Sequence, residues 1–382
     1  MLLCRIKLKA RINPDIQKSN IMIKYKRVAV KVGSNVLTRP DGRLDVTRVS
    51  AIVDQISVLH KAGAEIILIS SGAVASGRSE IKAHKKLDAV SARQLFSAVG
   101  QAKLINRYYE LFREQGIACG QILTTKENFG SRSLYLNQKN CISVMLENKV
   151  IPIVNENDTT SITELMFTDN DELSGLMATM MDVDALIILS NVDGIFNGNP
   201  SDPGSQVIRQ ILPDQQDMDD YISDQKSTLG RGGMHTKCAI AQKVAAEGIA
   251  VMIANGKKEN ILLDLLKKPE STVCTLFVPS EKEISSIKKW IAHSEDFAKG
   301  VVYVNVGAEE ALLDESKASS LLPVGISGIE GEFEEGDIVK IIGESGRVIG
   351  VGKVQYDSVS ARKLIGKKGH KPFIHYDYMS LD

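Results

Sequence analysis

Near its N-terminus the chain reads Val28-Ala-Val-Lys-Val-Gly-Ser-Asn-Val-Leu37. Four of the first five residues are small or β-branched and apolar, and they run into a Gly-Ser turn, which predicts a short strand. Apolar residues then recur at i, i+3, i+4 and i+7 between Val49 and Leu59, which predicts an amphipathic helix. A second apolar strand, Glu65-Ile-Ile-Leu-Ile-Ser70, follows. Strand, helix and strand in this order predict a βαβ unit with parallel strands.

The same alternation continues along most of the chain. Further strands are expected at 117–123, 150–154, 184–190 and 249–253, and further helices at 89–115, 134–147, 171–181, 236–247 and 259–267. The strands are apolar on both sides, as expected when helices cover both faces of a sheet. We therefore expect an α/β fold with a mostly parallel central sheet and helices on both faces.

The alternation of strands and helices stops after Gly300. Three further strands are expected there, at 301–306, 337–342 and 347–354, with glycines between them. This part predicts a small β-rich domain. The expected division is a basic, disordered N-terminal extension (1–25), an α/β domain (26–280), a linker (281–298) and the β-rich domain (299–382). The first 27 residues contain eight lysines and arginines against one acid, without the apolar core of a secretory signal.

Composition excludes several classes of protein. The 382 residues have a formal net charge of zero and 5% aromatic residues, which argues against a global attraction to nucleic acid or to an acidic membrane surface. Five scattered cysteines contain no C-x-x-C pair, which argues against a disulfide scaffold and a cysteine zinc site. No apolar run is long enough to span a bilayer. A reducing cytoplasm is the expected location.

Polar residues gather where the expected strands end: Gly33-Ser-Asn35, Ser70-Ser-Gly72, Asn155-Glu-Asn-Asp158 and Ser190-Asn-Val-Asp-Gly194. Ligands of parallel sheets bind at the carboxyl ends of the strands. Asn and Asp are also ordinary turn and cap residues, and for any single cluster capping is the better interpretation. Several clusters at one edge of a sheet favour a site for a polar ligand.

Lys31 is a further candidate because it lies within an apolar strand, where an ammonium group must be paired or must face a cavity. At an edge strand it would instead extend to water. The run Gly230-Arg-Gly-Gly-Met-His-Thr-Lys237 precedes an expected helix and is either a turn or an anion-binding loop. His235 alone favours a loop residue over a general base, and neither a P-loop nor a G-x-G-x-x-G strand–turn–helix motif is present.

Six motifs in one order carry a family resemblance: 28–37, 70–77, 154–158, 169–171, 189–196 and 232–237. Together they resemble the amino acid kinase family, and within it the enzymes that phosphorylate glutamate. The resemblance runs from about Lys26 to the C-terminus, and the tail resembles a PUA domain. It implies transfer of phosphate from ATP to the γ-carboxylate of L-glutamate, giving L-glutamyl 5-phosphate, the first step of proline biosynthesis. The attacking carboxylate is already an anion, so no general base is needed.

The resemblance also implies roles for individual residues. Lys31 and Lys237 would support phosphoryl transfer, with Asp171 holding both in place. Glutamate would contact Ser71, Gly72, Asn155, Asp158 and Asn170, with Asp158 suited to its α-ammonium group. ATP would contact Lys31, Ser190, Asn191, Arg231, Gly232, Gly233, Met234, His235, Thr236 and Lys237. Mg²⁺ would be carried by the ATP phosphates, so no protein metal site is expected.

Three positions depart from the pattern of the family, all on the nucleotide side: Asn35, the pair Ser190-Asn191, and Arg231. Two alternatives stay open. One is a relative that acts on another acidic substrate, such as aspartate. The other is an RNA-binding protein with an inactive kinase fold, although residues 299–382 contain ten lysines and arginines against thirteen acids, which opposes nucleic-acid binding. A homo-oligomer and inhibition by proline are further expectations, and no membrane partner is expected.

Overall fold

The structure, a computed structural model, describes residues 24–160, 167, 169–200, 202–213, 233–281, 285–314 and 317–381. The expected basic extension therefore lies almost wholly outside the described residues. By internal contacts the chain forms two compact units, residues 1–125 with 140–280, and residues 126–139 with 281–382.

An eight-stranded sheet in the order β3-β4-β2-β1-β5-β7-β8-β6 organises the first unit in the described chain. All neighbouring pairs are parallel except β7 with β8, so the expected mostly parallel sheet is confirmed. The strands are β1 (Arg27–Val32), β2 (Glu65–Ser70), β3 (Cys119–Thr124), β4 (Ile151–Glu156), β5 (Ala185–Ser190), β6 (Gln210–Ile211), β7 (Ala250–Asn255) and β8 (Thr275–Phe277).

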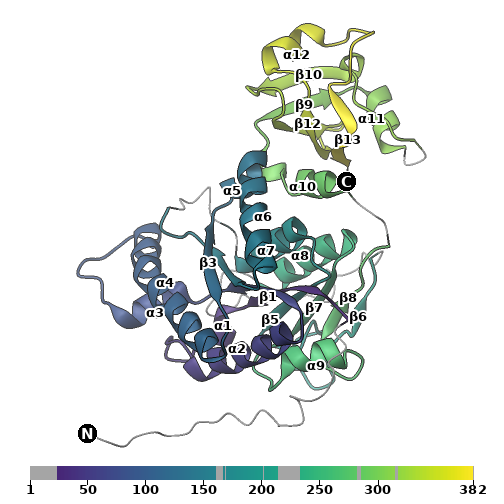
Figure 1. Cartoon of the computed structure of the whole chain (residues 1–382). Coiled ribbons are helices and arrows are strands. Elements are labelled where there is room, and N and C mark those ends of the chain that lie inside the picture. The colour runs from purple at the N-terminus through teal and green to yellow at the C-terminus, as the bar shows by residue number, and fades with distance from the viewer. Residues whose placement is uncertain are drawn as a thin grey trace, which may run out of the picture. The chain divides into compact units, whose positions relative to one another are not determined.

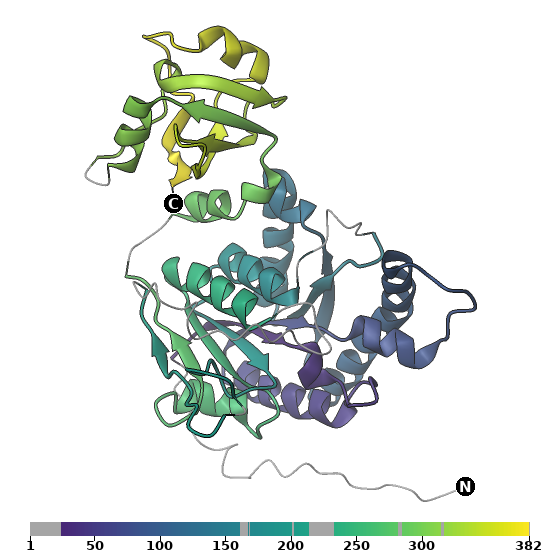
Figure 2. The same cartoon turned by 180° about the vertical axis from the view of Figure 1, so that it is seen from behind.

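Helices cover both faces of this sheet, as Figures 1 and 2 show. Helices α2, α4 and α9 pack on one face, while α7 and α8 lie on the other. The helices whose described residues belong wholly or partly to this unit are α1 (Ser34–Leu37), α2 (Val46–Lys61), α3 (Ala73–Glu80), α4 (Ala89–Glu114), α6 (Arg132–Glu147), α7 (Asn170–Met181), α8 (Met234–Ala246) and α9 (Ile261–Lys267).

The alternation of side chains along β1 decides where its lysine points. Val28, Val30 and Val32 are fully buried and belong to the core formed with α2, α4 and α9. Successive side chains of a strand point to opposite faces, so Ala29 and Lys31 face the side of α7. This places Lys31 near the N-terminus of α7, at the end of the sheet where β1, β2, β4 and β5 finish.

The second unit contains a five-stranded sheet in the order β10-β9-β11-β12-β13. Its core includes Val302, Ile341, Phe373 and Ile374. This confirms the expected separate β-rich part. Its elements are α5 (Glu127–Gly130), α10 (Ser286–Ala292), η4 (Glu295–Phe297), β9 (Gly300–Val304), α11 (Val306–Leu313), η5 (Pro323–Gly325), β10 (Ile326–Gly331), β11 (Ile338–Ile342), β12 (Val348–Val354), α12 (Ser358–Leu364) and β13 (Ile374–Leu381).

The segment 281–298, which the sequence analysis gives as a linker, groups with residues 126–139 and with the C-terminal part of the chain by internal contacts. Its described part contains α10, and the indole nitrogen of Trp290 donates a hydrogen bond of 2.8 Å to the carbonyl oxygen of Phe129. Trp290 also packs beside Tyr135, with 6.3 Å between ring centroids. Residues 126–139 therefore group with the C-terminal part of the chain. Among the described helices, none is long and apolar enough to cross a membrane.

Candidate active site

A cavity of about 980 Å³ lies at the carboxyl ends of β1, β2, β4 and β5. Its volume is near the upper end of the range for ligand sites, roughly 300–1,000 Å³, and so leaves room for two ligands. Ten of the sequence-predicted site residues line it: Lys31, Ser71, Gly72, Asn155, Asp158, Asn170, Asp171, Ser190, Asn191 and Lys237.

One buried carboxylate holds two lysines at the cavity. Asp171, in the first turn of α7, accepts a hydrogen bond from Nζ of Lys31 at Oδ1, and its Oδ2 lies 3.0 Å from Nζ of Lys237 in the first turn of α8. Asp171 is 1% exposed and Lys31 is 4% exposed. Burial raises the pKa of Asp171, but the two ammonium groups outweigh burial and leave this pKa below its usual value. The arrangement presents two fixed cations in one place.

Asp169, which the sequence analysis included only as the first residue of the motif 169–171, adds a second carboxylate to this region. Its Oδ1 accepts hydrogen bonds from the backbone N–H groups of Asp171 (2.8 Å) and Glu172 (3.0 Å), which makes it the N-cap of α7. Burial, and then the charge of Asp171, raise the pKa of Asp169 to about 6. Asp169 also lines the cavity, which a cap assignment does not reveal.

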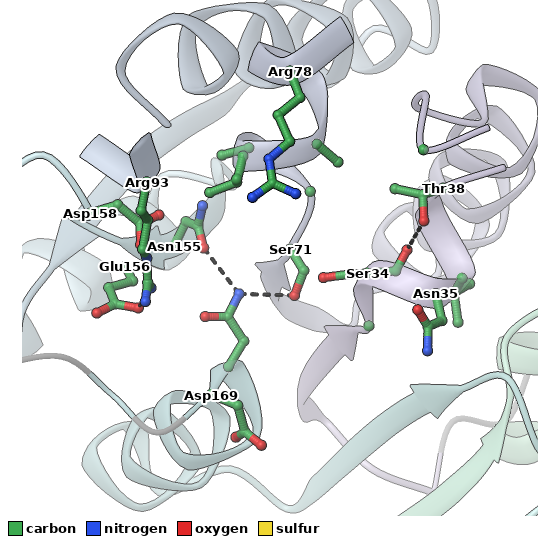
Figure 3. A pocket seen from close by; sticks show the side chains of 18 of the residues that line it. Ser34, Asn35, Thr38, Ser71, Arg78, Arg93, Asn155, Glu156, Asp158 and Asp169 are labelled. Atoms are coloured by element: carbon green, nitrogen blue, oxygen red, sulfur yellow. Dashed lines mark hydrogen bonds and ion pairs between the residues drawn. The ribbon is translucent and has the colours of Figure 1, made fainter. Parts of the chain in front are cut away.

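A chain of amide and hydroxyl groups crosses the floor of the cavity (Figure 3). Nδ2 of Asn170 donates to Oγ of Ser71 (2.9 Å) and to Oδ1 of Asn155 (3.0 Å). Nδ2 of Asn155 in turn donates to Oε1 of Gln101 on α4 (2.8 Å). Beside Ser71, Gly72 has a φ of 106°, a left-handed conformation that favours glycine, and it turns the chain from β2 into α3. The polar clusters of three elements therefore form one surface.

Asp158 lies in an ion-pair cluster centred on Arg93 of α4. Nε of Arg93 pairs with Asp158 and its Nη2 pairs with Glu156, while Oγ of Ser97 donates to Asp158 (3.0 Å). Burial raises the pKa of Glu156 to about 7, against the opposing charge of Arg93 and with the charge of Asp158 adding to the rise. Burial also raises the pKa of Asp158, again against Arg93.

Sequence reasoning missed Arg93, although a signal for it was present. Arg93, Ser97 and Gln101 recur at intervals of four along α4, so they share one face of the helix. Ser97 and Gln101 are buried, and all three bind polar groups at the end of β4 or just after it. A polar stripe on the buried side of a helix is the signal that predicts contact with a functional site.

Only part of the predicted ATP-binding region lies within the described residues. Ser190 and Asn191 follow β5 and line the cavity, with Oγ of Ser190 donating to Oδ1 of Asn191 at 3.4 Å. Gly233, Met234, His235 and Thr236 open α8 but are not among the lining residues in the described chain. Arg231 and Gly232 lie outside the described residues.

The amino acid kinase family model matches residues 26–255, and the PUA domain model matches residues 300–373. The glutamate 5-kinase of Bacteroides thetaiotaomicron is 67% identical over 94% of this chain and 99% of its own length. The chain belongs to the amino acid kinase family, among the glutamate 5-kinases. The glutamate 5-kinase of Chlorobaculum tepidum is 46% identical over 94% of this chain and 98% of its own length. The carbamate kinase from Giardia lamblia bound to AMP-PNP aligns with a TM-score of 0.49 and 15% identity, over 67% of this chain and 99% of that chain.

Proposed function

We propose that this glutamate 5-kinase uses ATP to phosphorylate the γ-carboxylate of L-glutamate, which yields L-glutamyl 5-phosphate for proline biosynthesis. Relatives at 67% and 46% identity over 94% of the chain carry the name of this activity. The observation that carries the proposal is the pair of lysines on Asp171 at one end of a cavity large enough for two substrates.

The reaction requires one anion to approach another. An oxygen of the γ-carboxylate attacks the γ-phosphorus of ATP, a new O–P bond forms, and the bond from that phosphorus to the bridging oxygen of ADP breaks. No proton is transferred, because the nucleophile is already ionised. Catalysis therefore depends on positioning and positive charge, which Lys31 and Lys237 supply from fixed positions on β1 and α8.

The α-ammonium group of glutamate is assigned to Asp158. The cluster of Asp158, Glu156 and Arg93 contains two carboxyl groups and one guanidinium group, so the entry of an ammonium group balances its charge once Glu156 ionises, at a pH of about 7. Figure 3 shows Asn155 beside this cluster and Ser71 beyond it, and Asn170 hydrogen-bonds to both of them. The substrate then lies along the floor of the cavity with its γ-carboxylate toward the lysines.

Mg²⁺ is assigned to the phosphate oxygens of ATP. The described residues contain no group of three or more His, Cys, Asp or Glu able to hold a metal ion, and both oxygens of Asp171 are already engaged by lysines. Mg²⁺ keeps several waters and is commonly bound through substrate phosphates. When bound, it would neutralise charge on the phosphates of the leaving group.

The proposal also covers the cellular location, the oligomeric state and the inhibition of the enzyme. We assign it to the cytoplasm, in keeping with the free thiols of Cys119, Cys141, Cys238 and Cys274. A homo-oligomer is supported by β3, an edge strand of the sheet on which Leu123 is 38% exposed. Proline is proposed as an inhibitor, because it carries the same α-carboxylate and a cationic amine that the glutamate site would bind.

Trapping the product with hydroxylamine tests the function. Incubation of the enzyme with Mg-ATP, hydroxylamine and L-glutamate should give the γ-hydroxamate together with one ADP per product, and the Lys31→Ala variant should give neither above background. Aspartate and N-acetylglutamate serve as competing acids. A hydroxamate formed from aspartate but not from glutamate would contradict the proposal.

A further inference from the structure

Arg78 is a cavity residue to which neither the sequence motifs nor the reaction assigns a role. It lies in the last turn of α3 and lines the cavity. Figure 3 shows its side chain directed into the cavity above Ser71 and Asn155. Within the described part of the chain, Arg78 makes no ion pair with a carboxylate, which distinguishes it from Lys31, Lys237 and Arg93.

The position of Arg78 is fixed by close packing of α3 against α4. A Cβ added at Gly77 would overlap the carbonyl oxygen of Phe96, and one added at Gly100 would overlap the carbonyl oxygen of Ala73. The two helices therefore meet through their backbones. The guanidinium group of Arg78 also lies over the ring of Phe96, 5.6 Å from its centroid, in a cation–π arrangement. The planar guanidinium group presents its donors in a fixed arrangement, so it loses little freedom for each hydrogen bond that it forms with a ligand.

The charges around the cavity leave one group of the substrate without a partner. The γ-carboxylate and the phosphates are matched by Lys31 and Lys237. Arg93 already pairs with two carboxyl groups, Glu156 and Asp158, so its guanidinium group is occupied, whereas Asp158 can attract an ammonium group. The α-carboxylate of the substrate therefore needs a cation elsewhere, and a guanidinium group binds a carboxylate through two parallel hydrogen bonds.

We propose that Arg78 binds the α-carboxylate of the amino-acid substrate and, together with Asp158, restricts the enzyme to substrates with a free α-amino acid group. This inference rests on the proposed function, since it concerns the same substrate. Arg78 belongs to α3 and Asp158 to the segment after β4, on different sides of the cavity. The α-carboxylate and the α-ammonium group are therefore bound by different parts of the chain.

Comparison of L-glutamate with its α-amide, L-isoglutamine, isolates the contact. Isoglutamine keeps the γ-carboxylate and the α-ammonium group but has no charge at the α-carbonyl. Arg78→Gln should raise the KM for glutamate about 10- to 100-fold, the usual range for loss of a charge-assisted hydrogen bond. The constant for isoglutamine, measured as KM or as a competitive inhibition constant, should change clearly less than the KM for glutamate, by about two- to tenfold at most, because the lost hydrogen bond ends on a neutral carbonyl oxygen. Arg78→Lys should recover part of the affinity for glutamate.

Two control variants separate the contact from other effects. Arg113→Gln removes an arginine of α4 that also stacks on an aromatic ring, Tyr109, but that does not line the cavity, and it should leave both constants unchanged. Lys82→Gln removes a second cation from the cavity lining and tests for a general field effect. The KM for ATP and the thermal midpoint should be unchanged in Arg78→Gln.

Three results would overturn the inference while leaving the proposed function intact: an unchanged KM for glutamate in Arg78→Gln, equal changes for glutamate and isoglutamine, or an equal loss in Lys82→Gln. Failure of the proposed function would look different, because the wild-type enzyme would then give no hydroxamate from glutamate.

Discussion

Asp171 carries one negative charge between two ammonium groups, so the three residues together keep a net positive charge. Replacing either lysine removes the charge that offsets repulsion between the carboxylate and the phosphates. We expect Lys31→Ala and Lys237→Ala each to lower kcat at least ~10²-fold, as for loss of a group that stabilises charge in the transition state. Steady-state kinetics at saturating ATP and glutamate measure this.

Lys103→Ala is a matched control for these two variants, because Lys103 forms an exposed ion pair with Glu80 and does not line the cavity. Its kcat should equal that of the wild type. A wild-type rate in Lys31→Ala or in Lys237→Ala would remove that lysine from the mechanism.

Because of Glu156, we expect the free energy of unfolding to fall as the pH rises toward 7. Burial raises its pKa to about 7, from a usual value of 4.5. Between these two values the folded chain holds a proton that the unfolded chain has released, so stability falls as pH rises through this range. The Glu156→Gln variant has no titrating group at this position, so it does not show this loss of stability. Urea unfolding at several pH values from 5 to 8 should show the wild type losing stability relative to Glu156→Gln as pH rises.

The exposed Glu110→Gln substitution on α4 is the control for this series, and its difference from the wild type should stay constant with pH. A constant difference for Glu156→Gln as well would show that Glu156 is ionised throughout the range, and that Arg93 fully offsets its burial.

At the scale of elements, contact between α3 and α4 holds Arg78, Ser71 and Arg93 in one geometry. Alanine at Gly77 or Gly100 would force the two backbones apart. We expect each substitution to lower the free energy of unfolding by about 1–3 kcal/mol or more, the usual cost of overpacking. The KM for glutamate should rise as well, because residues on both helices line the cavity. Chemical denaturation and kinetics measure the two effects.

Gly307→Ala provides the comparison, because Gly307 lies in α11 and a Cβ there would meet only Oδ1 of Asn305 at 3.8 Å. Alanine favours helix over glycine, so this variant should be as stable as the wild type or more so. If Gly77→Ala and Gly307→Ala behaved alike, the close contact of α3 with α4 would not matter to stability.

Elements built on local periodicity were predictable from the sequence, and those built on distant contacts were not. The strands at Arg27–Val32 and Glu65–Ser70 and the long helix α4 follow from their own patterns. Helix α3 contains Gly77 and two serines and packs through its backbone, so it lacks apolar periodicity. Helix α10 lies in a charged stretch, and its tryptophan finds its partner 161 residues away.

The same distinction applies to the site. Its polar clusters were predictable because each directly follows a strand, and the sheet brings their ends together. The partners of those clusters come from other elements: Arg93 is 65 residues from Asp158, and Asp171 is 140 residues from Lys31. The family resemblance supplied the second pair and included Asp169 in a motif without assigning it a role, whereas no motif contained Arg93 or Arg78.

At the scale of the whole molecule, the cavity and the PUA domain occupy different parts of the chain. Every lining residue of the cavity lies between Lys31 and Lys237, whereas the PUA model matches residues 300–373. Phosphoryl transfer thus depends on the first compact unit. The second unit must act, if it acts on other molecules, through its own surface.

The charge of that second unit makes RNA an unfavourable partner. Residues 299–382 contain more acids than bases, and the local basic run that ends α12 is partly neutralised, since Nη1 of Arg362 pairs with Glu332 at 2.8 Å. Affinity for nucleic acid comes largely from phosphate contacts and falls steeply with salt. Filter-binding titrations of the full chain should therefore show no micromolar binding of single-stranded or hairpin RNA at physiological salt. Glu332→Gln releases Arg362 and should strengthen whatever binding appears at low salt. Micromolar binding by the wild type at physiological salt, abolished by Lys367→Glu, would instead identify this unit as an RNA-binding module.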